Sequence, residues 1–89
     1  MRILNLSPVA NDGGGMRTLA FFDLELTPDV RLYGLRLLEA PDGNRVVYAA
    51  QAGSRRTATF SRPLAEAITN LISTELEAVT ADVRKQFSA

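Results

Sequence analysis

The chain has 89 residues, 46% of them hydrophobic and 22% charged, and its ten basic and ten acidic residues give a formal net charge of zero. This length and composition predict one globular domain, and the neutral charge argues against a strong, indiscriminate nucleic-acid binder. The lack of cysteine, histidine, a secretory signal pattern and a long apolar run excludes a disulfide framework and the commonest metal ligand, and favours a cytoplasmic protein without a membrane partner.

In the first half of the chain, strand-like segments alternate with turn residues, which is typical of a β-meander. Residues 2–9 predict a short strand that lies at a sheet edge or ends at Pro8, because proline cannot donate to a ladder. The glycine-rich segment 11–15 predicts a turn; it lacks the Gly-Lys-Ser/Thr ending of a phosphate-binding loop. Residues 16–26 alternate apolar and polar side chains and predict a half-buried strand.

Two further strands are expected before the chain changes character. In residues 30–39 the apolar pattern slips by one position at Gly34, which indicates a β-bulge. Ala40-Pro41-Asp42-Gly43 favours a type I turn that closes a hairpin into residues 45–51. That last segment is apolar on both faces, so we expect it to be central or covered on both sides. Residues 57–60 are the candidate for a fifth short strand.

The C-terminal part predicts one amphipathic helix over residues 62–87, with Ser61 as its N-cap and Pro63 in its first turn. The apolar stripe is longer than one sheet covers, since strands of this length extend about 25 Å and the helix about 36 Å. Three outcomes remain open: a break near residues 80–82, a frayed end, or packing on a second subunit. We favour a homodimer, and the interface residues it predicts are Val79, Val83 and Phe87.

A basic segment separates the two halves. Residues 52–63 contain three arginines and no carboxylate. The residues that we expect to contact backbone phosphates are Ser54, Arg55, Arg56, Thr57 and Arg62. Arg36 and Arg45 extend this patch if they share its face. The alternative is that the arginines are solvated loop residues, some of them paired with Glu39 or Asp42.

Other chemistry finds little support in the sequence. Asp23 and Glu25 share a strand face, but such a pair usually marks the solvated side of a sheet, and no catalytic signature is present. We therefore expect a non-enzymatic protein without catalytic residues, cofactor, metal or small-molecule substrate. Phe60 and Tyr48 are expected to pack in the core and not to form a stacking platform for bases.

In its order of elements the chain resembles the stage V sporulation protein G (SpoVG) family of small bacterial proteins. The matching residues are Met16-Arg17-Thr18-Leu19-Ala20, Leu35-Arg36-Leu37-Leu38, Asp42-Gly43-Asn44, Val47-Tyr48-Ala49, the basic pair Arg55-Arg56, and Pro63-Leu64. The resemblance covers roughly residues 2–79. The chain departs from the family in the basic loop, where Ala50 to Arg56 replaces Met-Pro-Ser-Lys-Arg and the segment before Pro63 is shorter.

The resemblance implies a sheet with a C-terminal helix, a dimer formed through sheet and helix contacts, and regulatory binding of DNA or RNA. Our interpretation is an α+β domain with a four- to five-stranded antiparallel meander and one long C-terminal helix. We expect it to bind nucleic acid weakly, as a homodimer. The alternative is a non-enzymatic protein–protein interaction or dimerisation module, whose binding would be less sensitive to salt.

Overall fold

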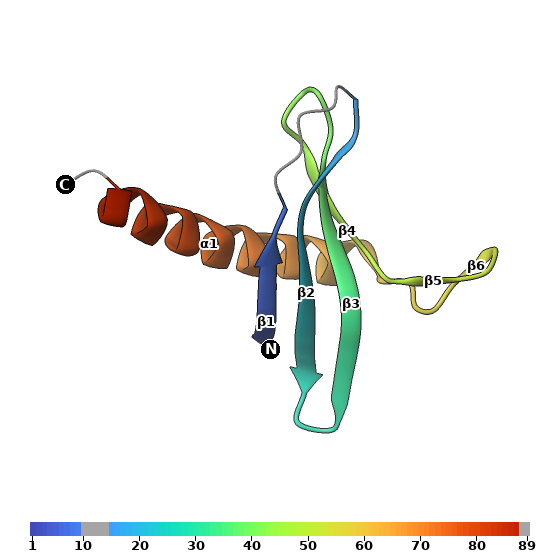
Figure 1. Cartoon of the computed structure of the whole chain (residues 1–89). Coiled ribbons are helices and arrows are strands. Elements are labelled where there is room, and N and C mark those ends of the chain that lie inside the picture. The colour runs from blue at the N-terminus through green and yellow to red at the C-terminus, as the bar shows by residue number, and fades with distance from the viewer. Residues whose placement is uncertain (10–14, 88–89) are drawn as a thin grey trace.

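The computed structural model describes residues 1–9 and 15–87, with side chains described as far as residue 80. One antiparallel sheet in the order β1-β2-β3-β4 is crossed on one face by a single long helix (Figure 1). The elements are β1 (Arg2–Pro8), β2 (Arg17–Thr27), β3 (Val30–Glu39), β4 (Arg45–Tyr48), β5 (Gln51–Ala52), β6 (Arg55–Arg56) and α1 (Arg62–Phe87). The predicted α+β meander with a C-terminal helix is confirmed.

The strands lie side by side in chain order, and two of their connections are tight hairpins. Thr27 and Val30 pair across a two-residue connection between β2 and β3. Between β3 and β4, the Gly43 amide donates to the Ala40 carbonyl at 2.9 Å, as the predicted turn requires. The turn predicted at residues 11–15 lies outside the described residues except for Gly15.

Gly34 forms the predicted bulge in β3. Phe22 pairs with Leu35 and Leu24 with Leu32, so β3 holds one more residue than β2 over this stretch. Gly34 has a φ of 70°, a left-handed conformation that glycine adopts without a Cβ penalty. Its amide donates to Asp23 Oδ1 at 2.9 Å, which fixes the bulge to the neighbouring strand.

Replacing Gly34 with alanine is expected to lower the free energy of unfolding by about 1–2 kcal/mol, because an L-residue is strained at this φ. The added Cβ would meet only the Ala50 Cβ, at 3.9 Å, so the cost comes from the backbone and not from a clash. Urea unfolding monitored by circular dichroism measures the change. Gly34→Asn is the control, since asparagine tolerates left-handed backbone, and it should recover part of the loss. Two unchanged unfolding midpoints would contradict the assignment.

The core lies between α1 and one face of the sheet. Alternate residues of the strands face the helix, and residues one turn apart on α1 face the sheet. The buried cluster consists of Phe22, Leu24, Leu35, Leu37, Val47, Ala49, Ile68 and Ile72. Each large apolar side chain removed from water here contributes roughly 1.5–3 kcal/mol. The helix is thereby fixed across the sheet, and the opposite sheet face is left without a covering element among the described residues.

The helix α1 begins as predicted and does not break. The Ser61 carbonyl accepts the first intrahelical hydrogen bond, from the Ala65 amide at 2.8 Å, which is the N-cap position. The helix continues through residues 80–82, so the predicted alternative of a break there is wrong. It runs on past β1 (Figure 1).

The apolar stripe of α1 outruns the core. Leu76 still packs against the buried cluster, whereas Val79 is 37% exposed. The side chains of Val83 and Phe87, the other two predicted interface residues, lie outside the described residues. No helix in the described part of the chain has the length and apolar character needed to cross a membrane.

Two expectations about residues 45–60 are wrong. The strand predicted over residues 45–51, as central or covered on both sides, is the edge strand β4 and ends at Tyr48, while β1, which contains Pro8, is the other edge as expected. Residues 57–60 form no strand; instead the chain makes the hairpin β5–β6 before them. Thr57 explains the change, because both its amide and its hydroxyl donate to the Ala50 carbonyl, at 2.9 and 2.8 Å, and close the neck of the hairpin.

Candidate nucleic-acid interface

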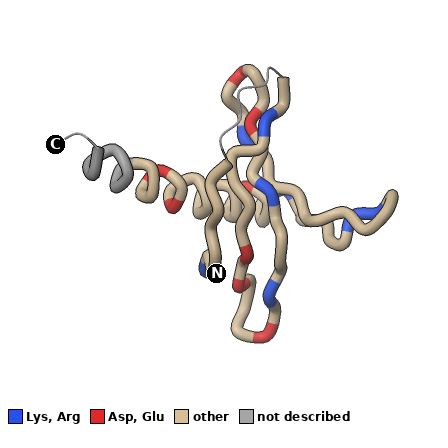
Figure 2. The backbone as a smooth tube through the Cα atoms, viewed as in Figure 1, with Lys and Arg blue, Asp and Glu red and all other residues tan. Residues whose placement is uncertain are grey.

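The basic segment forms a small antiparallel ribbon that projects from the end of β4 (Figure 1). Gln51 pairs with Arg56 and Ala52 with Arg55, so Gly53 and Ser54 form the turn. Gly53 has a φ of 63° and Ser54 has no positive φ, the pattern of a type II′ turn with glycine first. The ribbon places the basic pair away from the core, where Figure 2 shows it in blue.

The structure separates the predicted phosphate contacts into two groups. Ser54, Arg55 and Arg56 are exposed on the ribbon and lie together. The Thr57 hydroxyl is already donated to the Ala50 carbonyl, so this residue has a structural role. Arg62 begins α1, with its Nε 3.3 Å from Glu66 Oε1 in an exposed ion pair.

Arg56 returns from the ribbon to the sheet. Its guanidinium carbon lies 4.0 Å from the centre of the Tyr48 ring, a cation–π contact. The expectation that Tyr48 packs in the core is wrong: it lies on the sheet face opposite α1, because its neighbour Val47 faces the helix. The strand β4 is therefore apolar on both faces because its second face includes Tyr48, whose ring contacts the Arg56 guanidinium.

Arg36 joins Tyr48 on this open face. The register pairs Arg36 with Tyr48 on β4 and with Phe21 on β2, and directly opposed residues point to the same side of a sheet. The Phe21 side is open, with 44% of the residue exposed. We call these residues, Phe21, Arg36, Tyr48 and Arg56, the aromatic–arginine row. Phe21 and Tyr48 are two strand spacings apart, about 10 Å.

The arginines fall into two classes by their partners. Those that pair with carboxylates are Arg2 and Arg31 (with Glu25), Arg17 and Arg45 (with Glu39), and Arg62 (with Glu66). Among the described side chains, Arg36, Arg55 and Arg56 make no ion pair. Among the described side chains, the arginines without a carboxylate partner therefore lie on the ribbon and the adjoining sheet face.

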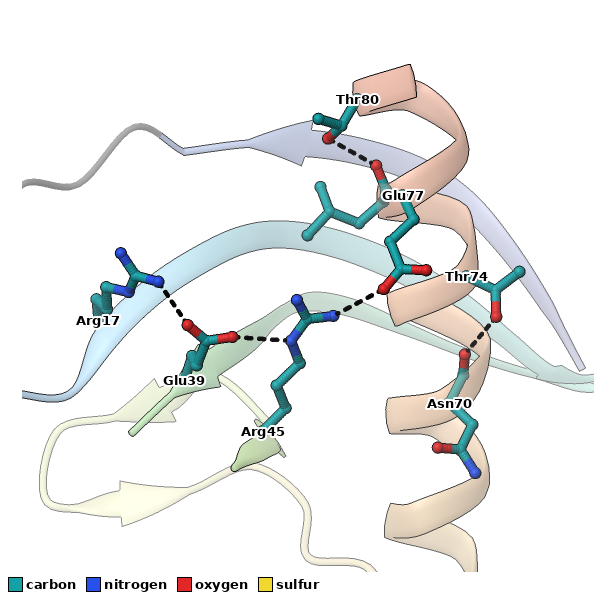
Figure 3. A network of polar contacts seen from close by, with 8 residues as sticks. Arg17, Glu39, Arg45, Asn70, Thr74, Glu77 and Thr80 are labelled. Carbon is teal, nitrogen blue, oxygen red and sulfur yellow. Dashed lines mark hydrogen bonds and ion pairs between the residues drawn. The ribbon is translucent and has the colours of Figure 1, made fainter. Parts of the chain in front are cut away.

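Arg45 does not extend the patch. It lies on the helix side, with its Nε 3.1 Å from Glu39 Oε2 and its Nη1 3.7 Å from Glu77 Oε1 (Figure 3). Arg17 completes the network on the other Glu39 oxygen. The expectation that some arginines pair with Glu39 is confirmed for Arg45. The hydrogen bond from Arg17, followed by that from Arg45, lowers the pKa of Glu39 below its ordinary value of 4.5.

Replacing Glu39 with glutamine is expected to make the free energy of unfolding depend less on pH in the acid range. A carboxyl whose pKa is lower in the folded state contributes stability above its unfolded pKa, near 4.5, and loses it as the pH falls through the folded pKa. Wild type should therefore be more stable than Glu39→Gln at neutral pH, and the two should converge in acid. Urea midpoints at a series of pH values measure the difference. A constant gap between the two proteins at every pH would contradict this role.

A groove borders the row. A groove of about 950 Å³ runs between the edge of β4 and the first half of α1, and Tyr48, Arg56 and Arg62 line it. Cationic groups therefore occur both on the open face and in the groove. Phe60 lines the same groove and also packs against the core, as the sequence predicted.

The two carboxylates considered as a catalytic pair are held by neighbours. Asp23 accepts hydrogen bonds from the Gly34 amide and from Asn5 Nδ2, each at 2.9 Å. Glu25 forms two ion pairs, with its Oε2 3.4 Å from Arg2 Nη2 and its Oε1 3.3 Å from Arg31 Nη2. Both therefore join β1, β2 and β3 on the open face.

The comparisons with known proteins add no identification: no family model, no curated protein and no solved structure matches the chain. The resemblance to the SpoVG family stays a prediction from the sequence.

Proposed function

We propose that this protein binds nucleic acid weakly, as a small regulatory protein, by pairing Arg36, Arg55 and Arg56 with backbone phosphates. The observation that carries the proposal is that these three arginines, which make no ion pair among the described residues, lie on the ribbon and the adjoining sheet face. Guanidinium groups bind phosphate oxygens in a bidentate manner, and exposed arginines without acidic partners keep this capacity.

The ribbon is suited to phosphate contacts and not to base readout. Ser54 adds a hydroxyl at the turn, next to Arg55. Phosphate contacts fix the position of a nucleic acid without reading its sequence. The zero net charge of the chain predicts low affinity, and the three arginine–phosphate contacts predict binding that weakens as the salt concentration rises.

We also propose that the protein acts as a homodimer. The support is Val79, which continues the apolar stripe of α1 beyond the core and is 37% exposed. Val83 and Phe87 continue the same spacing in the sequence. Two ribbons in one dimer would convert a weak single contact into a bivalent one.

Fluorescence anisotropy with short single- and double-stranded oligonucleotides at two ionic strengths tests the proposed binding. We expect micromolar or weaker dissociation constants that increase several-fold from low to physiological salt. No binding at low salt would refute the proposal. Binding that persists unchanged at high salt would show that phosphates are not the ligand.

Val79→Asp is expected to shift the protein toward monomer, because it places a charge on the apolar surface proposed to meet the second subunit. Sedimentation velocity over a range of concentrations measures the shift. The matched control is Thr74→Asp, an exposed helix residue whose hydroxyl bonds only the Asn70 carbonyl (Figure 3). A wild-type protein that sediments as a monomer at every concentration would refute the dimer.

The second candidate is an interaction module that binds protein. The open outer edge of β4, whose Val46 and Tyr48 are only half-buried, favours it, because an unpaired edge accepts another strand. Association through this edge would resist salt, whereas phosphate binding would not. Absence of oligonucleotide binding in the anisotropy series at low salt would favour this second candidate.

A further inference from the structure

The open sheet face has two ends of different chemistry. Toward Arg2 and Arg31 the charges are matched, since both arginines pair with Glu25. Toward Phe21 and Arg36 the aromatic–arginine row contains two cations and no carboxylate. Both ends expose a ring, since Tyr33 near Arg31 is 65% and Phe21 is 44% exposed, but only at the second end do the arginines lack a carboxylate partner among the described side chains.

The roles within the row differ. Arg56 covers the Tyr48 ring at 4.0 Å, so Tyr48 holds a guanidinium in place and is not itself free to receive a ring. Phe21 is 44% exposed, and its nearest neighbour across the strand pair is the cationic Arg36. Phe21 therefore provides the ring surface of the row, and the two arginines provide flat cationic groups beside it.

We infer that the row accepts unpaired bases, so that the ligand is a single-stranded nucleic acid; this rests on the proposed function. Aromatic rings and guanidinium planes on an open surface are the groups on which splayed bases stack, whereas the bases of a duplex are stacked on one another and closed to such contacts. Phe21 stacks a base, while Arg36, Arg56 and the neighbouring Arg55 hold the adjoining phosphates.

Charge argues against a second copy of the chain as the occupant of this face. A two-fold dimer presents the same patch from both subunits. A dimer centred on the row would bring the arginines of both copies together, which is repulsive, and the nearby Asp23 and Glu25 already bond other groups of their own chain. A polyanion with exposed bases pairs its phosphates with the arginines and stacks a base on the Phe21 ring.

The experiment compares three labelled probes of equal length by anisotropy at low salt: an oligothymidylate, an abasic oligonucleotide and a duplex. Wild type is expected to bind the oligothymidylate on the order of tenfold more tightly than either of the others. Phe21→Leu retains an apolar side chain but lacks the ring, and should reduce binding of the oligothymidylate to the abasic level with an unchanged salt slope. Tyr33→Leu, an aromatic residue 65% exposed but outside the row, is the control and should leave the preference intact.

The outcomes separate the inference from the proposed function. Equal affinity for all three probes overturns the base-stacking inference and leaves phosphate binding in place. No binding to any probe overturns both. If Phe21→Leu shifts the protein from dimer to monomer in sedimentation and leaves the affinity unchanged, the face binds a second copy and the inference is refuted. Circular dichroism of both variants establishes that they fold.

Discussion

Replacing Arg36, Arg55 and Arg56 together with alanine is expected to weaken binding to a single-stranded oligonucleotide on the order of 100-fold at low salt. These are the arginines whose charge no described carboxylate compensates. A phosphate that no arginine neutralises keeps its condensed counterions, so the slope of log affinity against log salt should fall by roughly 0.7 per phosphate, or about 2 for the three arginines. Anisotropy titrations over a series of salt concentrations measure both quantities.

The chain offers a control with the same change in charge. Arg2, Arg31 and Arg62 are exposed, and each pairs with a glutamate. Their triple alanine variant lowers the net charge by the same amount and is expected to change the affinity only slightly. The control should lose little stability, since exposed ion pairs contribute little, and the first variant loses no ion pair and one cation–π contact, that of Arg56 with Tyr48. Equal decreases in affinity for the two variants would show that overall charge, and not the ribbon and sheet face, governs binding.

The sequence was sufficient for the parts of the fold that local rules determine. Alternation in β2, the slipped period at Gly34 and the turn ending at Gly43 each reflect a backbone requirement of a few neighbouring residues. The same holds for Ser61 at the start of α1. Such signals depend on geometry within one turn or one strand, and they can therefore be recognised without knowledge of the tertiary structure.

The predictions that were wrong concern features that depend on contacts with a second element of the fold. A strand that is apolar on both faces looks central, but β4 is an edge, and the second side of its pattern is Tyr48 beneath Arg56. The ribbon β5–β6 has two residues in each strand, too few for any periodicity. Its turn was recognisable, because glycine followed by serine favours a type II′ hairpin. The interpretation of this segment as a loop missed that signal.

Only part of the candidate site could be predicted from the sequence. The clustered Arg55 and Arg56 are adjacent in the chain, so their segment was found directly. Arg36 was an open question, because its membership depends on the register that sets it between Phe21 and Tyr48. Which arginines have acidic partners is likewise a property of cross-strand neighbours. Arg45, close to the ribbon in sequence, points to the helix side and pairs with Glu39.

Ile72→Ala is expected to lower the free energy of unfolding by about 2–5 kcal/mol, the range for deleting a buried branched side chain. Ile72 is fully buried between α1 and the sheet. A chain of this length has a total stability of about 4–13 kcal/mol, so the loss is a large fraction of the total. Urea unfolding by circular dichroism measures the loss.

The exposed Glu75 on the same helix provides the comparison, since Glu75→Ala keeps helix propensity and should change stability by no more than about 0.5 kcal/mol. The sheet face that carries the aromatic–arginine row is uncovered because α1 packs on the opposite face, where Ile68 and Ile72 contact the strands. Loss of that packing should therefore abolish oligonucleotide binding together with the fold. If Ile72→Ala unfolded the helix but left the affinity of Arg36, Arg55 and Arg56 for phosphate intact, the ribbon would bind without the sheet, and the open face would have no part in recognition.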